Sequence, residues 1–164
     1  MVDRRYIAYG CAAAVFALDR LTKWLVETRL GFEDTVKVIP GFFDIVRSQN
    51  RGVAFGIFND SSFPWRTALL IAVALVAVVV VSWILRRPEA LDRRAFWGLT
   101  LVLGGAAGNL FDRALTGQVT DFLLLYAGDF QWPAFNVADS AVVVGSALLL
   151  LDLVKPKRQA ANVS

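Results

Sequence analysis

Two aspartates in the second half of the chain have neighbours that suit acid–base chemistry. Asp121 interrupts an apolar stretch, and Asp139 lies near the start of the next apolar run. Two nearby carboxylates cannot both ionise cheaply, so one keeps a proton while the other accepts a proton from water. That water can attack an amide, and the protonated partner donates to the carbonyl oxygen. The chain has no histidine, which excludes histidine triads and histidine-ligated metals.

Asp139 also has a structural explanation. Asn136 follows Pro133 and is predicted to cap a helix, which places Asp139 at the third helical position, where the unpaired amides favour an acidic residue. Asp121 has no such evident partner in its loop. If the dipole argument holds, Asp139 is the ionised member of the pair in the free protein, a hypothesis because the two carboxyls titrate jointly.

Further ionisable residues lie inside predicted membrane helices, where each costs about 2.5 to 3.5 kcal/mol on insertion scales. Asp19 and Lys23 are four residues apart, so they share a helix face and can neutralise each other, which alone would hold helices in register. Asn109 and Asp112 also share a face, whereas Arg113 points elsewhere on the same turn. Arg113 suits either a counter-ion or a direct contact with a substrate.

The composition predicts a membrane protein that must position these groups. Hydrophobic residues make up 57% of the 164 residues, charged residues 19%, and the mean hydropathy is +0.55. We predict a single domain over 1–164, an all-α integral membrane fold with a bundle of four transmembrane helices. The predicted helices span about 6–26, 67–85, 95–114 and 137–154, with outer loops at 27–66 and 115–136.

The basic residues predict the orientation of this bundle. They gather in the connections at one end, as Arg4, Arg5, Arg86, Arg87, Arg93, Arg94, Lys155, Lys157 and Arg158. By the positive-inside rule both termini are cytoplasmic, so the polar residues of three separate segments converge near the outer leaflet. Packing alone would not gather carboxylates there, and we therefore expect a site. No basic stripe is interleaved with aromatics, so nucleic acid is not an expected partner.

The first outer loop is predicted to carry a small extracytoplasmic β-sheet. Residues 35–39 and 42–46 read as short strands around the Pro40-Gly41 turn. Residues 53–55 are predicted to form an interfacial amphipathic helix. Gly104 and Gly108 have the spacing typical of close helix packing.

Five motifs together resemble one known family, lipoprotein signal peptidase (signal peptidase II), whose members are membrane aspartic peptidases. The motifs occur in the family's order from the first predicted helix to the fourth. They are Asp19-Arg20-Leu21-Thr22-Lys23, Asn50-Arg51-Gly52-Val53-Ala54-Phe55, Gly104-Gly105-Ala106-Ala107-Gly108-Asn109-Leu110-Phe111-Asp112-Arg113, Val119-Thr120-Asp121-Phe122 and Pro133-Ala134-Phe135-Asn136-Val137-Ala138-Asp139-Ser140.

The resemblance implies a monomeric, multi-pass enzyme of the bacterial inner membrane, in contact with membrane lipids, that acts on diacylglyceryl-modified prolipoproteins. It would remove the signal peptide by cutting just before the lipidated cysteine, with no cofactor and no metal. By the family pattern Asp121 and Asp139 are the catalytic pair. The positions that line the groove or support this pair are Asn50, Gly52, Asn109, Arg113, Asn136, Asp19, Lys23 and Asp112. Two departures from the pattern are Thr120 and the polar run Arg47-Ser48-Gln49.

Three other functions fit parts of this pattern less well. A proton-coupled transporter or channel component would string ionisable groups across the membrane, whereas these gather at one face and 67–85 has none. A presenilin- or prepilin-type peptidase carries Gly-x-Gly-Asp inside a helix, and the nearest string here is Tyr126-Ala127-Gly128-Asp129 in an outer loop. If the chain were a structural scaffold, Asp121 and Asp139 could each be replaced without loss of function.

Overall fold

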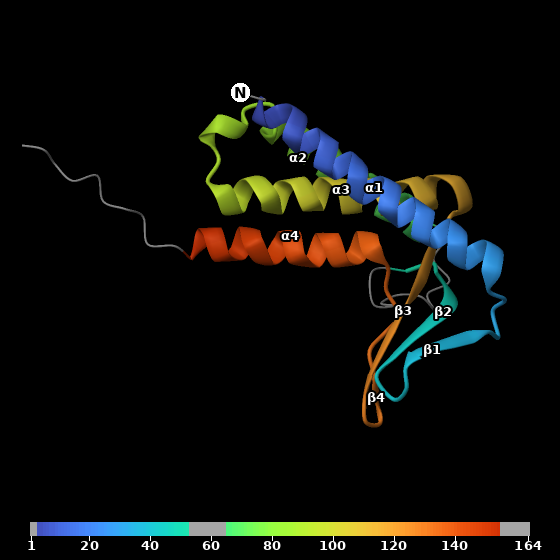
Figure 1. The fold of residues 1–164 in the computed structure, drawn as a ribbon. Coiled ribbons are helices and arrows are strands. Elements are labelled where there is room, and N and C mark those ends of the chain that lie inside the picture. Colours follow the sequence, from blue (N-terminus) through green and yellow to red (C-terminus); the bar gives the residue numbers. More distant parts are fainter. Residues whose placement is uncertain (1–2, 53–64, 155–164) are drawn as a thin grey trace, which may run out of the picture.

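The fold is mostly helical with a small antiparallel sheet at one end. The computed structural model describes residues 3–52 and 65–154. Its elements in chain order are α1 (Arg4–Arg29), β1 (Thr35–Ile39), β2 (Phe43–Asn50), α2 (Arg66–Ile84), the 3₁₀ helix η2 (Pro88–Ala90), α3 (Arg93–Thr116), β3 (Val119–Ala127), β4 (Phe130–Gln131) and α4 (Val137–Leu153). The start of α1 and the end of α4 lie at the same end of the bundle, away from the sheet (Figure 1).

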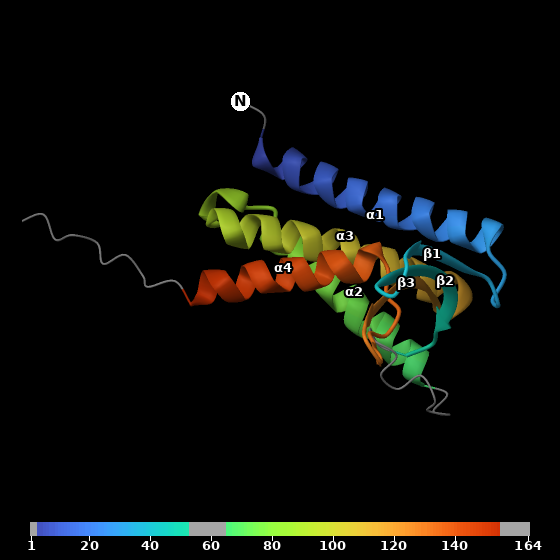
Figure 2. The same ribbon diagram turned by 60° about the horizontal axis from the view of Figure 1, so that its bottom comes forward.

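Helix α3 is the centre of the bundle, because it packs against α1, α2 and α4. Figure 2 shows α1, α3 and α4 running alongside one another, with α2 crossing at an angle. Glycines allow this close approach: a Cβ on Gly104 would lie 2.7 Å from the backbone oxygen of Ala12, and one on Gly98 would lie 2.8 Å from that of Gly145. The prediction of close packing at Gly104 and Gly108 is therefore confirmed.

The four helices differ in hydropathy. Among the described residues, one helix, over Thr67–Ile84, is long and apolar enough to cross a membrane by length and composition. Most of α2 faces outward, with Val73 60% exposed and Val76 61% exposed. The other three long helices carry charged residues, and five of these are buried: Asp19, Lys23, Asp112, Arg113 and Asp139.

The sheet has the order β1-β2-β3-β4, and each neighbouring pair is antiparallel. The prediction of two strands in the first outer loop is confirmed, although the second continues to Asn50. The outer loop predicted at 115–136 contains a strand that the sequence did not predict, because Val119–Ala127 forms the nine-residue β3 and pairs with β2. Gly117, at φ 74°, lets the chain turn from α3 into this strand.

The predicted helix boundaries needed small corrections. The helices begin and end at Arg4–Arg29, Arg66–Ile84, Arg93–Thr116 and Val137–Leu153, so the first and third are longer at both ends than predicted. Asp3 caps α1 by accepting a hydrogen bond from the Arg5 backbone at 2.9 Å, which explains the earlier start. The interfacial helix predicted at 53–55 lies outside the described residues.

Candidate active site

Asp121 lies on β3, where the sheet meets the ends of the helices. It is 2% exposed, and two amides donate to its carboxyl group: Asn136 Nδ2 to Oδ1 at 2.6 Å and Asn50 Nδ2 to Oδ2 at 2.9 Å. Asn50 is the last residue of β2, and its own Oδ1 accepts from the Gly52 backbone at 2.7 Å. That second bond fixes which end of the Asn50 amide faces the aspartate.

Asp139 lies in the first turn of α4 and is held by a capping box, as predicted. Asn136 Oδ1 accepts from the Asp139 backbone at 2.9 Å, and Asp139 Oδ2 accepts from the Asn136 backbone at 3.3 Å. Asp139 Oδ1 accepts from Asn109 Nδ2 at 2.8 Å. The capping box therefore explains the position of Asp139. The groups that donate to its carboxylate, a backbone amide and an asparagine amide, carry no charge and do not neutralise it.

Asn136 links the two aspartates directly. Its side-chain amide donates to the Asp121 carboxyl through Nδ2 and accepts from the Asp139 backbone through Oδ1. Asn136 is fully buried. The structure thus brings Asp121 of the sheet and Asp139 of the fourth helix to the same asparagine.

Burial and, to a smaller extent, the negative charge of Asp139 together raise the pKa of Asp121 to about 7. The hydrogen bonds from Asn50 and Asn136 act in the opposite direction. The raised pKa favours the protonated form of Asp121 up to about neutral pH. Within the described part of the chain, neither carboxylate forms an ion pair.

A second group of carboxylates surrounds Lys23. Nζ of this fully buried lysine donates to Asp19 Oδ2 at 2.7 Å and to Asp112 Oδ2 at 2.6 Å. Its third bond, at 3.1 Å, goes to Asn109 Oδ1. Lys23 therefore uses all three donors, and Asn109 connects it to the Asp139 carboxyl.

Two further contacts complete this lysine cluster, which comprises Asp19, Lys23, Asp112 and Arg20. Arg20 forms an ion pair with Asp112. Asp19 Oδ1 accepts from the Ala138 backbone at 2.9 Å, so α1 satisfies one of the free amides at the start of α4. The cluster holds three helices together at the level of the candidate site.

Arg113 points away from the lysine cluster and toward the end of β2. Its Nη2 donates to the Gly52 backbone oxygen at 2.7 Å, and the residue is 9% exposed. Arg113 therefore ties α3 to the segment that carries Asn50.

The ten residues predicted as site residues all join one network of hydrogen bonds, which links β2, β3, α1, α3 and α4. Sequence reasoning did not assign Arg20, although Arg20 and Lys23 are three residues apart on one helix face. It also missed a set of contacts on the other side of β3.

These contacts join the end of α1 to the sheet, and we call them the α1 latch: Thr120–Glu27 and Arg47–α1. Thr120 Oγ1 donates to Glu27 Oε1 at 2.6 Å. Arg47 Nη1 donates to the backbone oxygens of Glu27 and Leu30, each at 3.0 Å, and so satisfies carbonyls that the helix end leaves open. Thr120 is one of the two departures from the family pattern, and Arg47 begins the other, the polar run Arg47-Ser48-Gln49.

The latch coincides with an irregularity in the sheet. Between Ile45 and Ser48 the pairing of β2 with β3 shifts by one residue, which marks a β-bulge. Arg47 lies in this bulge, and Ser48 pairs with Asp121. The bulge and the latch therefore set the position of Asp121 relative to the helices.

An apolar cavity of about 290 Å³ lies beside Asp139. One wall is α4 from Asp139 to Val144, and the other comes from the segment after β4 and from β3. The lining residues are Leu125, Trp132, Phe135, Asp139, Ser140, Val143 and Val144. Val143 and Val144 are about half exposed on the outer face of α4, so the cavity opens on the side of the bundle.

Comparison with known proteins agrees with this arrangement. The family described as signal peptidase (SPase) II matches residues 11–155. A lipoprotein signal peptidase of Solibacter usitatus is 64% identical over 164 residues, which covers 100% of both chains. One of Symbiobacterium thermophilum is 42% identical over 148 residues, covering 90% of this chain and 94% of that protein.

Two solved structures, each described as a bacterial membrane enzyme, have the same fold. One has a TM-score of 0.83 at 26% identity and covers 96% of this chain and 94% of its own. The other has a TM-score of 0.78 at 28% identity, with 91% and 93% coverage. With the motifs in order, most of the chain matched and the polar network assembled, the protein belongs to the signal peptidase II family.

Proposed function

We propose that this chain is an aspartic endopeptidase that removes the signal peptide from diacylglyceryl-modified prolipoproteins by cleaving just before the lipidated cysteine. The observation that carries the proposal is the pair of buried carboxyls, Asp121 and Asp139, bridged by Asn136 and bonded by neutral amides. Such a pair holds one proton in common, as the raised pKa of Asp121 indicates.

The proposed reaction uses the two carboxyls in opposite roles. Ionised Asp139 accepts a proton from water, and the resulting hydroxide attacks the carbonyl carbon of the scissile amide. Protonated Asp121 donates to the carbonyl oxygen, which gives a neutral tetrahedral intermediate. On collapse, Asp139 returns its proton to the leaving nitrogen and Asp121 takes one back from the hydroxyl, so the pair ends in its starting state.

The neighbouring residues support these roles. Asn50 and Asn136 hold Asp121, while Asn109 holds Asp139 and connects it to Lys23. These amides orient the two carboxyl groups and favour their ionised form without supplying a positive charge, because an amide donates a hydrogen bond but carries no charge. The apolar cavity beside Asp139 suits the apolar part of a lipidated substrate.

We further propose that all four long helices span the bacterial inner membrane, with both termini cytoplasmic and the site near the outer leaflet. The charges of α1 and α3 support this, because Asp19, Lys23 and Asp112 are buried and paired inside the bundle rather than facing lipid. Cysteine labelling of a residue near Glu33 should succeed from the outer side only. We expect a monomer that contacts membrane lipids and binds no nucleic acid.

The proposal favours a peptidase over a proton-coupled transporter because the ionisable groups gather at one end of the bundle. To test it, the purified protein is incubated with a diacylglyceryl-modified precursor, the unlipidated precursor and a precursor with Cys→Ser at the cleavage site. We expect a product from the lipidated precursor alone, with the lipidated cysteine at its new N-terminus by mass spectrometry. Proton-coupled transport in proteoliposomes without cleavage would support the rival.

We expect no cofactor and no metal, because water activated by two carboxyls suffices for amide hydrolysis. A chelator should leave the cleavage rate unchanged. Strong inhibition that zinc reverses would contradict this expectation.

A further inference from the structure

Two hollows lie at the end of the bundle away from the sheet. They are lined by similar residues, none of which has a role in the proposed peptidase reaction. The first, about 410 Å³, is lined by Arg93, Arg94, Trp97, Leu101 and Leu148. The second, about 360 Å³, is lined by Trp83, Ile84, Arg86, Arg87, Ala90 and Leu91. Each combines two adjacent arginines, one tryptophan and aliphatic side chains.

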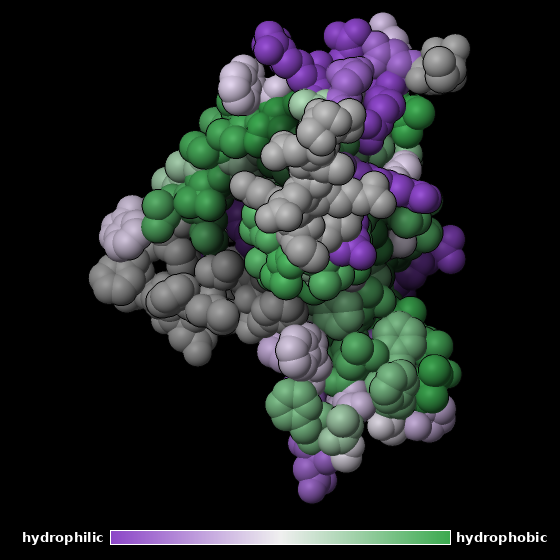
Figure 3. Space-filling model, turned by 90° about the vertical axis from the view of Figure 1, so that its left-hand side faces the viewer, coloured by the Kyte–Doolittle hydropathy of each residue, from purple (hydrophilic) through white to green (hydrophobic). Residues whose placement is uncertain are grey.

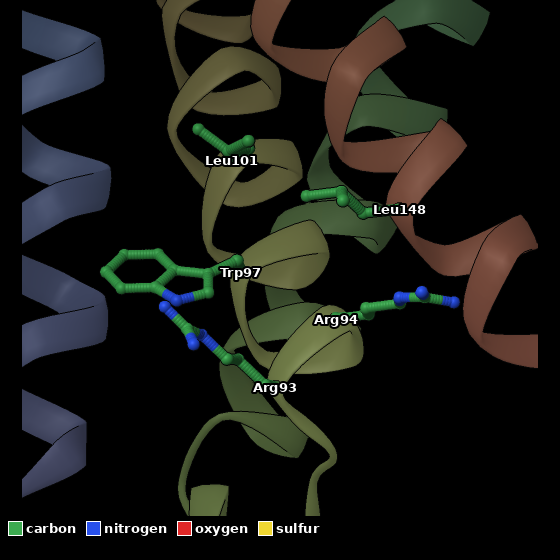
Figure 4. Close-up of a pocket in the computed structure, with 5 residues that line it drawn as sticks. All are labelled: Arg93, Arg94, Trp97, Leu101 and Leu148. Atoms are coloured by element: carbon green, nitrogen blue, oxygen red, sulfur yellow. The ribbon is translucent and has the colours of Figure 1, made fainter.

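The first hollow has a charged rim and an apolar wall. In Figure 4 the guanidinium of Arg93 lies beside the ring of Trp97, and Arg94 extends toward α4. Leu101 and Leu148 line the hollow farther along the bundle, from α3 and α4. From Arg94 to Leu101 the helix advances about 10 Å at about 1.5 Å per residue. A ligand here would place its charge at the bundle end and an apolar chain along the helices.

The arginines are available to a ligand. Arg86, Arg87 and Arg93 are exposed, and within residues 3–52 and 65–154 their side chains form no hydrogen bond or ion pair. Arg94 donates to the backbone oxygen of Leu151 at 3.0 Å and keeps further donors. Figure 3 faces this end of the molecule and shows hydrophilic residues beside hydrophobic ones.

The acidic residues nearby do not line either hollow. Glu89 and Asp92 lie in the α2–α3 connection, and Asp152 lies near the end of α4. The connection from Arg86 to Arg94 still has four arginines against two carboxylates, so its charge is net positive. An anion is the complementary ligand.

We propose that each hollow binds one anionic phospholipid, with the phosphate on the arginine pair and an acyl chain against the tryptophan and aliphatic wall. Arginine binds phosphate through its planar fork of donors, and tryptophan is enriched at the membrane interface. Basic pockets between helices at the cytoplasmic side have this chemistry. An acidic protein would satisfy the arginines but leave the apolar walls without a partner.

The proposal rests on the proposed membrane orientation, but it does not depend on the peptidase chemistry. The probe is phosphatidylglycerol, titrated into the purified protein in detergent and followed by native mass spectrometry, with phosphatidylcholine of the same acyl chains for comparison. We expect two tightly bound phosphatidylglycerol molecules, and phosphatidylcholine bound at least about tenfold more weakly.

The variants assign the two lipids to the two hollows. Arg93→Gln with Arg94→Gln should lose one lipid, with about a 30-fold weaker affinity there. Arg86→Gln with Arg87→Gln should lose the other. Arg5→Gln with Arg29→Gln makes the same change in net charge outside both hollows and should keep both lipids. Thermal unfolding of each variant checks that it is folded.

A second measurement keeps the arginines in place. Brominated phosphatidylglycerol should quench tryptophan fluorescence of the wild-type chain, and Trp97→Phe should remove part of that quenching. Equal binding of the two lipids, or an equal loss in the control with Arg5 and Arg29 replaced, would overturn the proposal. Because no cleavage is measured, either result leaves the peptidase proposal unaffected.

Discussion

Two pairs of buried aspartates share a single network in this protein, and their neighbours differ in charge. Asp19 and Asp112 both contact the ammonium group of Lys23, at 2.7 and 2.6 Å. Asp121 and Asp139 are bonded by the amides of Asn50, Asn109 and Asn136 instead.

The difference separates a structural role from a chemical one. A lysine between two carboxylates supplies a positive charge that both share, so this cluster binds helices together. Neutral amides orient two carboxyls without neutralising them, so the second pair must hold a proton at neutral pH. The comparison teaches that residue type alone does not assign a catalytic aspartate.

The largest expected effect on stability comes from removing the cation of the structural pair. Lys23→Met leaves Asp19 and Asp112 buried without their shared lysine, and breaking a buried pair costs about 3 to 5 kcal/mol. We expect a large drop in the thermal unfolding midpoint in detergent. Lys37→Met, on the exposed strand β1, is the control and should leave the midpoint nearly unchanged. An equal midpoint for both variants would show that the lysine cluster is not structural.

The stability that Asp121 contributes should depend on pH in the opposite sense from that of an ion-paired aspartate. The folded chain holds the Asp121 proton up to about pH 7, whereas the ordinary pKa is 3.8. The folded state therefore favours the protonated Asp121 carboxyl group more than the unfolded state does. As a result, the free energy of unfolding falls as the pH rises from about 3.8 to about 7.

Asp121→Asn removes this titration, so we expect a flatter dependence of the unfolding midpoint on pH than in the wild type. Cleavage by the wild type should also decline as the pH rises through about 7, because the shared proton is lost. A wild-type midpoint that rises between pH 4 and 7, with the rise lost in Asp121→Asn, would contradict the raised pKa.

A smaller effect is expected where a glycine makes room for the structural pair. A Cβ at Gly108 would lie 2.6 Å from Asp19 Oδ2 and 3.3 Å from the Ala138 Cβ. Overpacking of this kind costs about 1 to 3 kcal/mol, so Gly108→Ala should lower the midpoint. Gly10 has nothing within 4 Å of its Cβ position, so Gly10→Ala should not destabilise the protein.

The smallest expected effect comes from the α1 latch, which acts on the catalytic pair from behind β3. Thr120→Val keeps the shape and removes the hydrogen bond to Glu27, with a loss of about 1 kcal/mol in stability. We expect kcat to fall by less than about tenfold while KM stays constant, because Asp121 is the next residue. Thr120→Ser should restore kcat. A change in KM alone would place the latch in substrate binding instead.

Much of the helical bundle could be predicted from the sequence, because an uncharged apolar run such as Thr67–Leu85 has few other interpretations. The capping box was also predictable, since Asn136 and Asp139 have its spacing. Both signals are local, so a single stretch of chain contains them.

Strand β3 was missed because its partner lies far away in the sequence. Ser48 and Asp121 pair across the sheet, and no local pattern encodes that register. A partial signal existed in Gly128-Asp129, a turn typical of hairpins, with Gly128 at φ 62°. The α1 latch was missed for the same reason, because it joins Glu27 to Thr120.

The most direct test of the account compares the two catalytic aspartates with the wild type. Initial rates of cleavage of the diacylglyceryl-modified precursor are measured for Asp121→Asn and Asp139→Asn, with thermal unfolding as the check of folding. We predict that each variant is folded and slower by about a thousandfold or more, within the range of general acid–base catalysis. A folded variant of either kind that keeps more than about a tenth of the wild-type rate would contradict the shared-proton mechanism.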